Sequence, residues 1–149
     1  MDHPPEQSHA QRNELMSQQD IELVAAASEA RNHAYAPYSH YYVGAALLDE
    51  KGRRHVGCNV ENSSFPLGAC AEGGAISAMI AAGGKKIAVI AAVGGRESLE
   101  ACTPCGGCRQ RIAEFADDAT RIVLLDEQGR IVSHTMAEML PESFRLKKK

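Results

Sequence analysis

The chain has 149 residues, of which 44% are hydrophobic, so it is long enough to bury a core as one globular domain. Its net charge is −3, which excludes the basic field that nucleic-acid-binding proteins present to phosphates. The longest strongly apolar run, Ile87 to Val93, is far shorter than the roughly 20 residues that span a bilayer, and the first residues do not have the pattern of a signal peptide. Five cysteines without a secretory signal predict a reducing compartment, the cytoplasm.

Hydrophobic periodicity and turn signals predict elements in the order α-β-β-α-β-α-β-β-α. We expect a flexible leader at 1–16, a single domain at 17–145 and a basic tail at 146–149. Ser17 and Asp20 have the spacing of a capping box ahead of the first helix. The predicted elements are a helix at 18–34, strands at 41–48 and 54–60, a helix at 71–82, a strand at 87–93, a helix from 104 to about 115, strands at 121–126 and 130–134, and a helical turn at 135–140. Strand–helix–strand alternation predicts an α/β fold in which helices cover a sheet with parallel members.

Two short segments contain the residues with the clearest chemistry. Cys70-Ala71-Glu72 enters one predicted helix, and Pro104-Cys105-Gly106-Gly107-Cys108 enters the next. Thiolates are preferred zinc ligands, and the free N–H groups at a helix start favour thiolate over thiol. Three protein ligands leave the fourth position open for water, as in catalytic zinc sites. We therefore predict that Cys70, Cys105 and Cys108 hold Zn²⁺.

Glu72 follows the first cysteine at a spacing that directs its carboxylate toward the water and not toward the metal. A carboxylate there can take a proton from the water and deliver it to a substrate, and such acid–base catalysis contributes about 10²–10⁴-fold. A Cys-x-x-Cys pair alone is also compatible with redox activity, a structural zinc site or two buried thiols. Cys-x-Glu followed by Pro-Cys-x-x-Cys is far more specific and is the pattern of zinc deaminases.

A resemblance to one family extends over about residues 18 to 145. The segments that carry it are Tyr35-Ala36-Pro37-Tyr38-Ser39, Val43-Gly44-Ala45-Ala46-Leu47, Gly57-Cys58-Asn59-Val60-Glu61-Asn62, the two cysteine segments with Arg109-Gln110, and Leu140-Pro141-Glu142-Ser143-Phe144. In these segments the chain resembles the small homotetrameric cytidine deaminases of the three-cysteine zinc type. The resemblance implies a three-layer α/β/α fold with a mixed five-stranded sheet flanked by helices.

The resemblance also implies roles for individual residues. Cys70, Cys105 and Cys108 match the zinc ligands, and Glu72 matches the proton shuttle. The substrate-binding positions fall on Tyr41 against the nucleoside, Asn59 and Glu61 at the ribose hydroxyls, the backbone of Ala71 at the base, and Phe144 in a neighbouring subunit's site. The implied partners are a small nucleoside and three further copies of the chain in a homotetramer, with no nucleic acid and no membrane.

The chain departs from this family directly after Glu72. Three-cysteine members usually carry an arginine there, but this sequence has Gly73 and Gly74. Zn²⁺ with three thiolates has a net charge of −1, which an arginine next to the sulfurs would offset. Arg109, next to Cys108 in the sequence, is a candidate for that role. A second interpretation is a wider pocket that accepts a modified base.

Several functions are compatible with these motifs. Deamination of cytidine or deoxycytidine is the leading hypothesis, and the alternative substrates are a modified cytosine nucleoside or an aminonucleoside antibiotic of the blasticidin-S type. A polynucleotide-editing deaminase needs basic grooves, which this acidic chain lacks. A non-catalytic zinc module needs a fourth protein ligand, for which Cys102 is a candidate, and gives Glu72 no role.

Overall fold

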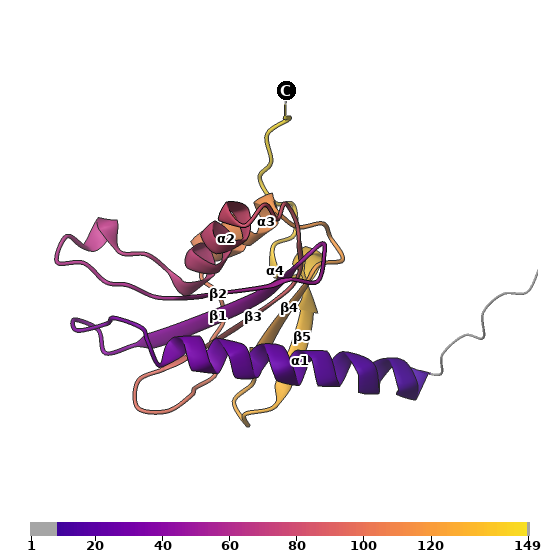
Figure 1. Ribbon diagram of the computed structural model, residues 1–149, viewed down its shortest axis with the longest axis horizontal. Helices are drawn as coiled ribbons and strands as arrows, with labels where there is room; N and C mark the ends of the chain where they lie inside the picture. Colours follow the sequence, from indigo (N-terminus) through magenta and orange to yellow (C-terminus); the bar gives the residue numbers. More distant parts are fainter. Residues whose placement is uncertain (1–8, 149) are drawn as a thin grey trace, which may run out of the picture.

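The computed structural model describes the backbone of residues 9–148 and the side chains of residues 18–148. A mixed five-stranded sheet forms the middle of three layers, with α1 across one face and α2 and α3 over the other (Figure 1). The elements are α1 (His9–Arg31), β1 (Tyr42–Asp49), β2 (Arg54–Cys58), the 3₁₀ turn η1 (Phe65–Leu67), α2 (Ala71–Ala81), β3 (Ile87–Gly95), α3 (Gly106–Glu114), β4 (Arg121–Leu125), β5 (Ile131–Thr135) and α4 (Met136–Met139). This architecture confirms the predicted α/β/α fold.

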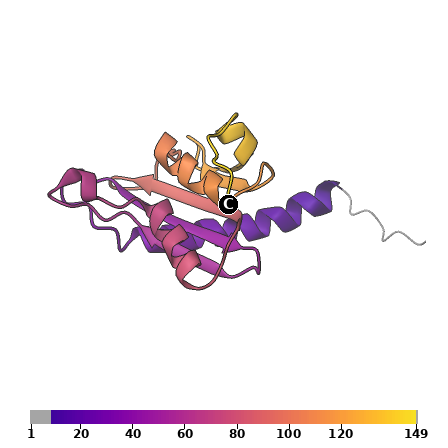
Figure 2. The ribbon, with the colours of Figure 1, turned by 90° about the horizontal axis from the view of Figure 1, so that it is seen from above.

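The strand order across the sheet is β2-β1-β3-β4-β5. Strand β1 is antiparallel to both β2 and β3, and β4 is antiparallel to β5. Strands β3 and β4 form the parallel pair, and the connection between them contains α3. This is the strand–helix–strand unit that the sequence predicts. Helices α2 and α3 lie next to each other on one face of the sheet, so their N-terminal ends can contribute to one site (Figure 2).

The two faces of the sheet bury separate hydrophobic clusters. On the α1 face, the helical stripe that includes Leu23 and Ala27 packs against β-strand residues such as Val89 and Val123. On the opposite face, α2 and α3 contribute Met79 and Ile112 to a larger cluster. Within the described residues, no helix combines the length and the apolar character needed to cross a bilayer.

Glycine allows α1 to approach the sheet closely. A Cβ atom placed on Gly44 of β1 would lie 1.9 Å from the carbonyl oxygen of Ala27 and 2.5 Å from the backbone nitrogen of Arg31. These are backbone atoms, which cannot move aside without displacing the helix. A side chain at this position would therefore separate two layers of the fold.

Gly44→Ala is expected to lower the free energy of unfolding by about 3 kcal/mol, since overpacking against backbone falls at the costly end of core insertions. Denaturant unfolding followed by circular dichroism measures this loss. Gly106→Ala is the matched control, because nothing lies within 4 Å of a Cβ atom at Gly106. A Gly44→Ala protein as stable as this control would contradict the packing described here.

The first helix differs from its predicted bounds. It begins at His9, whereas the sequence predicts a start near residue 18, and residues 9–16 of the expected leader are therefore helical. Ser17 lies inside the helix, so the predicted capping box is wrong. Asp20 instead pairs with Arg121 of β4, with 2.8 Å between Oδ1 and Nη2. Residues 1–8 of the leader and Lys149 of the tail lie outside the described residues.

The start of α3 also differs from the prediction. Cys105 is the N-cap residue and the helix begins at Gly106, so Pro104 precedes the helix and does not form its first turn. The Pro104 carbonyl accepts a hydrogen bond from Nε of Arg109 at 2.9 Å, which anchors the entry to the helix. At the chain's C-terminal end, Thr135 and Glu138 form a reciprocal capping box that starts α4.

Candidate active site

The N-termini of α2 and α3 border a cavity of about 420 Å³. Eight of the nine residues predicted for the site line this cavity: Tyr41, Asn59, Glu61, Cys70, Ala71, Glu72, Cys105 and Cys108. They come from β1, the segment after β2, and the starts of the two helices. Residues far apart in the sequence are therefore gathered around one cavity, which has room for a ligand of nucleoside size.

Cys70 is held by the local geometry of the helix start. It is the N-cap residue of α2, and its Sγ accepts a hydrogen bond from the backbone nitrogen of Gly73 at 3.3 Å. A hydrogen bond from the Cys108 thiol lowers the pKa of Cys70 to about 6, aided by the Gly73 N–H group and the charge of Arg111. The fold thus favours a thiolate at this position.

Cys108 is the other member of this sulfur pair. It is 2% exposed and lies in the first turn of α3. Its hydrogen bond to the Cys70 sulfur and its burial both raise the pKa of Cys108. Cys108 therefore keeps its proton and donates it in a hydrogen bond to the Cys70 thiolate, and a metal ion that displaces this proton would bind both sulfurs as thiolates.

Cys105 is separate from this pair. It lines the same cavity but is exposed at the N-cap of α3. Among the described side chains, no three His, Cys, Asp or Glu residues are gathered closely enough to hold a metal ion. The donor set nevertheless fits zinc chemically, because three thiols from two helix N-termini line one cavity. Of the three predicted ligands, the structure thus brings two into contact.

Glu72 occupies the first turn of α2 and is 5% exposed. Its carboxylate lies next to the Cys108 thiol, and it forms no ion pair with any basic side chain of residues 18–148. The positive end of the α2 dipole stabilises a negative charge at this position. A buried carboxylate that is not committed to a salt bridge, next to two cysteines, is available to accept and donate protons.

Asn59 and Glu61 lie just beyond the end of β2, not within the strand expected at 54–60, and both line the cavity together with Val60. The Asn59 amide donates to the carbonyl of Tyr41 and accepts from the backbone nitrogen of Val43, both at 2.8 Å. One N–H group and one lone pair of the amide stay available for a ligand. The side chain is thus fixed in orientation and still able to bind.

The Glu61 carboxylate is oriented by a tight turn. Its Oε1 accepts hydrogen bonds from the backbone nitrogens of Tyr38 at 2.9 Å and Ser39 at 3.2 Å. The Ser39 hydroxyl and these two amides lower the pKa of Glu61, so the group is an anionic acceptor near neutral pH. An anchored carboxylate of this kind suits a hydroxyl-bearing ligand.

Seven further residues line the cavity that sequence reasoning did not assign to the site: Val43, Val60, Phe65, Gly68, Ala69, Cys102 and Thr103. Val43 lies two residues after Tyr41, and residues two apart in a strand face the same side. Strand periodicity could therefore have indicated that Val43 lines the cavity. Phe65 is 74% exposed in η1, and its ring packs edge-on against Tyr38 with centroids 5.7 Å apart. Nothing in the local sequence pattern distinguishes Phe65, because only the folded loop brings it to the cavity.

Phe144 is the predicted site residue that does not line this cavity. Its side chain is 68% exposed, and its carbonyl accepts a hydrogen bond from Nε2 of Gln110 at 2.9 Å. Within one chain, the Phe144 side chain therefore lies on the surface and not in the cavity that would hold a ligand.

Arg109 does not contact the sulfurs. Its guanidinium donates to the carbonyl oxygens of Pro104 and Met139, each at 2.9 Å, and so ties the start of α3 to the end of α4. The hypothesis that Arg109 offsets the thiolate charge is therefore wrong, because its Nε and Nη1 atoms donate to backbone carbonyls and none of its donors forms a hydrogen bond with a cysteine sulfur of residues 18–148.

Comparison with known proteins explains this arrangement. The model of the cytidine and deoxycytidylate deaminase zinc-binding region matches residues 17–125. The chain belongs to this deaminase family. Zinc is the cofactor of the family, and the deaminase has the expected sequence order of cysteine and glutamate residues.

Its relatives match over most of their length. A cytidine deaminase of Sporosarcina psychrophila is 40% identical over 84% of this deaminase and 91% of its own chain. The crystal structure of a cytidine deaminase from Burkholderia pseudomallei superimposes with a TM-score of 0.76 at 40% identity, covering 83% of this deaminase and 98% of that chain. A blasticidin-S deaminase of Bacillus cereus is more distant, at 33% identity over 85% of this chain and 92% of its own.

Proposed function

We propose that this deaminase hydrolyses cytidine and deoxycytidine to uridine and deoxyuridine. Water adds at the ring carbon that bears the exocyclic amine, the C–N bond breaks, and ammonia leaves. The single observation that carries the proposal is one cavity lined by the Cys70–Cys108 pair, Glu72, and the Asn59–Glu61 pair. It combines metal ligands and an acid–base group with donors and acceptors for a sugar. The relatives named cytidine deaminase support the same reaction.

The roles follow from the position of each group. Cys70, Cys105 and Cys108 would hold the zinc ion, which when bound would lower the pKa of a water to about 7. Glu72 would accept one proton of the attacking water and deliver it to the ring nitrogen, and would then carry the second proton, from the hydroxyl group added to the ring carbon, to the departing amine. Because Glu72 is buried and forms no ion pair within the described residues, bulk solvent does not compete for these protons.

The sugar end of the substrate is bound by Asn59 and Glu61 in this proposal. Both side chains are oriented by backbone hydrogen bonds and keep unused donor or acceptor capacity. Tyr41 and the backbone of Ala71 border the same cavity and would contact the nucleoside. A free base lacks the hydroxyl groups that this pair would bind, so nucleosides are the expected substrate class.

The second candidate substrate is a modified cytosine nucleoside or an aminonucleoside antibiotic. The observation behind this alternative is that glycine at position 73 leaves space next to the Cys70 sulfur, but Gly73 lines a groove between α2 and α3 and not the cavity proposed for the substrate. The blasticidin-S deaminase of Bacillus cereus belongs to the same family, but its sequence identity to this chain is 33%, against 40% for the cytidine deaminase of Sporosarcina psychrophila. Cytidine therefore stays the first proposal.

The test is ammonia release by the zinc-loaded protein on cytidine, deoxycytidine, cytosine, N4-substituted cytidine and blasticidin S. Cytidine and deoxycytidine are expected to be turned over and cytosine is not. Turnover of blasticidin S alone would support the second candidate and contradict the first.

Glu61→Gln is expected to raise KM for cytidine by about 10- to 100-fold, because hydrogen bonds to a charged group contribute about 1.5–3 kcal/mol. Steady-state kinetics measure the change, and kcat should fall much less than kcat/KM. Glu97→Gln removes the same charge from an exposed loop residue and is the control. An unchanged KM in Glu61→Gln would remove this residue from the substrate-binding set.

We also propose that the deaminase is a homotetramer in the cytoplasm, with Phe144 completing a neighbouring subunit's site. The exposed Phe144 ring outside its own cavity supports the shared site. Five free cysteines support a reducing compartment. Light scattering of the zinc-loaded protein gives the assembly, and a monomer with full activity would exclude the shared site.

A further inference from the structure

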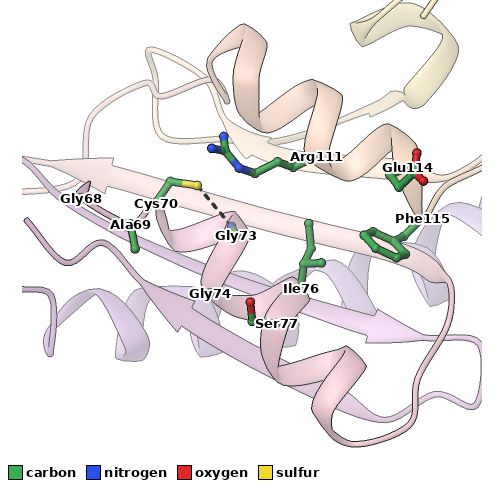
Figure 3. Close-up of a pocket in the computed structure, with 10 residues that line it drawn as sticks. All are labelled: Gly68, Ala69, Cys70, Gly73, Gly74, Ile76, Ser77, Arg111, Glu114 and Phe115. Carbon is green, nitrogen blue, oxygen red and sulfur yellow. Dashed lines mark hydrogen bonds between the residues drawn. The ribbon is translucent and has the colours of Figure 1, made fainter. Parts of the chain in front are cut away.

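A second groove lies behind the sulfur pair, between α2 and α3. It has a volume of about 540 Å³, and its lining includes Cys70, Gly73, Gly74 and Arg111 (Figure 3). Arg111 extends from α3 toward the start of α2, where Cys70 and Gly73 form their hydrogen bond (Figure 3). The guanidinium cation of Arg111 therefore lies in this groove, next to the proposed metal site.

Arg111 is in direct contact with Cys108 of the sulfur pair. Its Nη1 lies 3.9 Å from Sγ of Cys108, at the long end of an N–H···S hydrogen bond. Arg111 follows Cys108 by three residues, so both project from the same face of α3. Among the described side chains, no other arginine or lysine forms a hydrogen bond with a cysteine sulfur. Arg111 also forms no ion pair with a carboxylate of residues 18–148.

Two glycines make room for this guanidinium. A Cβ atom on Gly73 would lie 3.1 Å from Sγ of Cys70 and 3.6 Å from Cδ of Arg111. A Cβ atom on Gly107 would lie 3.2 Å from Nη1 of Arg111. A longer side chain at Gly73 would project into the space that the arginine occupies. The absence of a side chain at Gly73 and the position of Arg111 are thus parts of one arrangement.

We propose that Arg111 is a positioning residue that offsets the negative charge of the zinc-binding thiolates, and that Gly73 is required to admit it. This inference rests on the proposed zinc site. Three thiolates around Zn²⁺ leave a charge of −1, and a guanidinium that contacts Cys108 opposes that charge. Partners of metal ligands commonly change metal affinity or activity by about 10- to 100-fold when removed. Because Arg111 is exposed in the single chain, the lower end of this range applies.

The test measures zinc affinity by competition with a chromophoric chelator, with cytidine kinetics on the same samples. Arg111→Gln is expected to weaken zinc binding about tenfold and to lower kcat by a similar factor, with little change in KM. Arg111→Lys keeps the charge and should retain most of the affinity. Gly73→Arg combined with Arg111→Gln supplies a guanidinium from α2 and should restore both quantities.

The control is Arg130→Gln, which removes an arginine from the β4–β5 turn, where it pairs with Asp126. Zinc affinity in Arg111→Gln within twofold of the wild type would overturn the inference. Equal losses in Arg111→Lys and Arg111→Gln would overturn it as well, because charge would then not be the cause. A protein that shows the zinc effect but deaminates no cytidine would contradict the proposed substrate and leave this inference intact.

Discussion

Glu72→Gln is expected to lower kcat for cytidine by about 10²–10⁴-fold, the contribution of a positioned acid–base group. Glutamine has the same shape as glutamate but cannot carry a proton between water, ring nitrogen and amine. Since Glu72 is placed next to the sulfurs without being a predicted ligand, zinc content should stay at one per chain. Stopped assays of ammonia release and zinc analysis of the same sample measure both quantities.

Glu97→Gln is again the control, because it removes one carboxylate from the surface. Its activity and zinc content should equal those of the wild type. If Glu72→Gln keeps more than about a tenth of the activity, Glu72 is not the proton carrier. If it loses zinc together with activity, the residue acts through the metal site, which would also contradict the assigned role.

Removing Cys70 is expected to have an equally large effect through the metal. Zinc binding in small protein sites amounts to about 10–16 kcal/mol, so one of four ligands contributes roughly 2.5–4 kcal/mol, which corresponds to about 10²–10³-fold in affinity. Cys70→Ala should therefore bind zinc weakly and show no measurable turnover at stoichiometric metal. Cys70 is also the N-cap of α2, and its loss adds about 1 kcal/mol of destabilisation.

Cys58→Ser is the control for this prediction, because Cys58 lies at the end of β2 and is not among the residues that line the cavity. Cys102→Ser tests the non-catalytic alternative, in which Cys102 would be a fourth ligand. We expect Cys102→Ser to bind zinc as tightly as the wild type. A large loss of affinity in this variant would favour a closed structural site over an enzyme.

Most of the fold follows from local patterns that tertiary packing reinforces. The apolar runs in β1 and β3 predict both strands to within two residues, because strands buried on both faces of a sheet require such runs. The start of α1 could not be predicted in this way. Its first turns are polar, so hydrophobic periodicity is absent there, and Asp20 serves a tertiary ion pair and not a cap.

The candidate site was predictable where it depends on ligand chemistry and not where it depends on packing. The sequence indicates Cys70, Cys108 and Glu72 as site residues, because their residue types and spacing are specific for zinc deaminases. Adjacency to Cys108 suggested Arg109, but consecutive helical residues point about 100° apart, and the residue three positions on returns to the same face. Arg111 satisfies this geometry, so helix periodicity could have indicated it.

The most direct test of the account is a zinc titration of the metal-free protein, with conversion of cytidine to uridine measured at each step. Activity is expected to be absent without metal, to rise in proportion to added zinc and to level off at one zinc per chain. Full activity in the metal-free protein, or no activity on cytidine with one zinc bound, would contradict the proposed zinc-dependent cytidine deaminase.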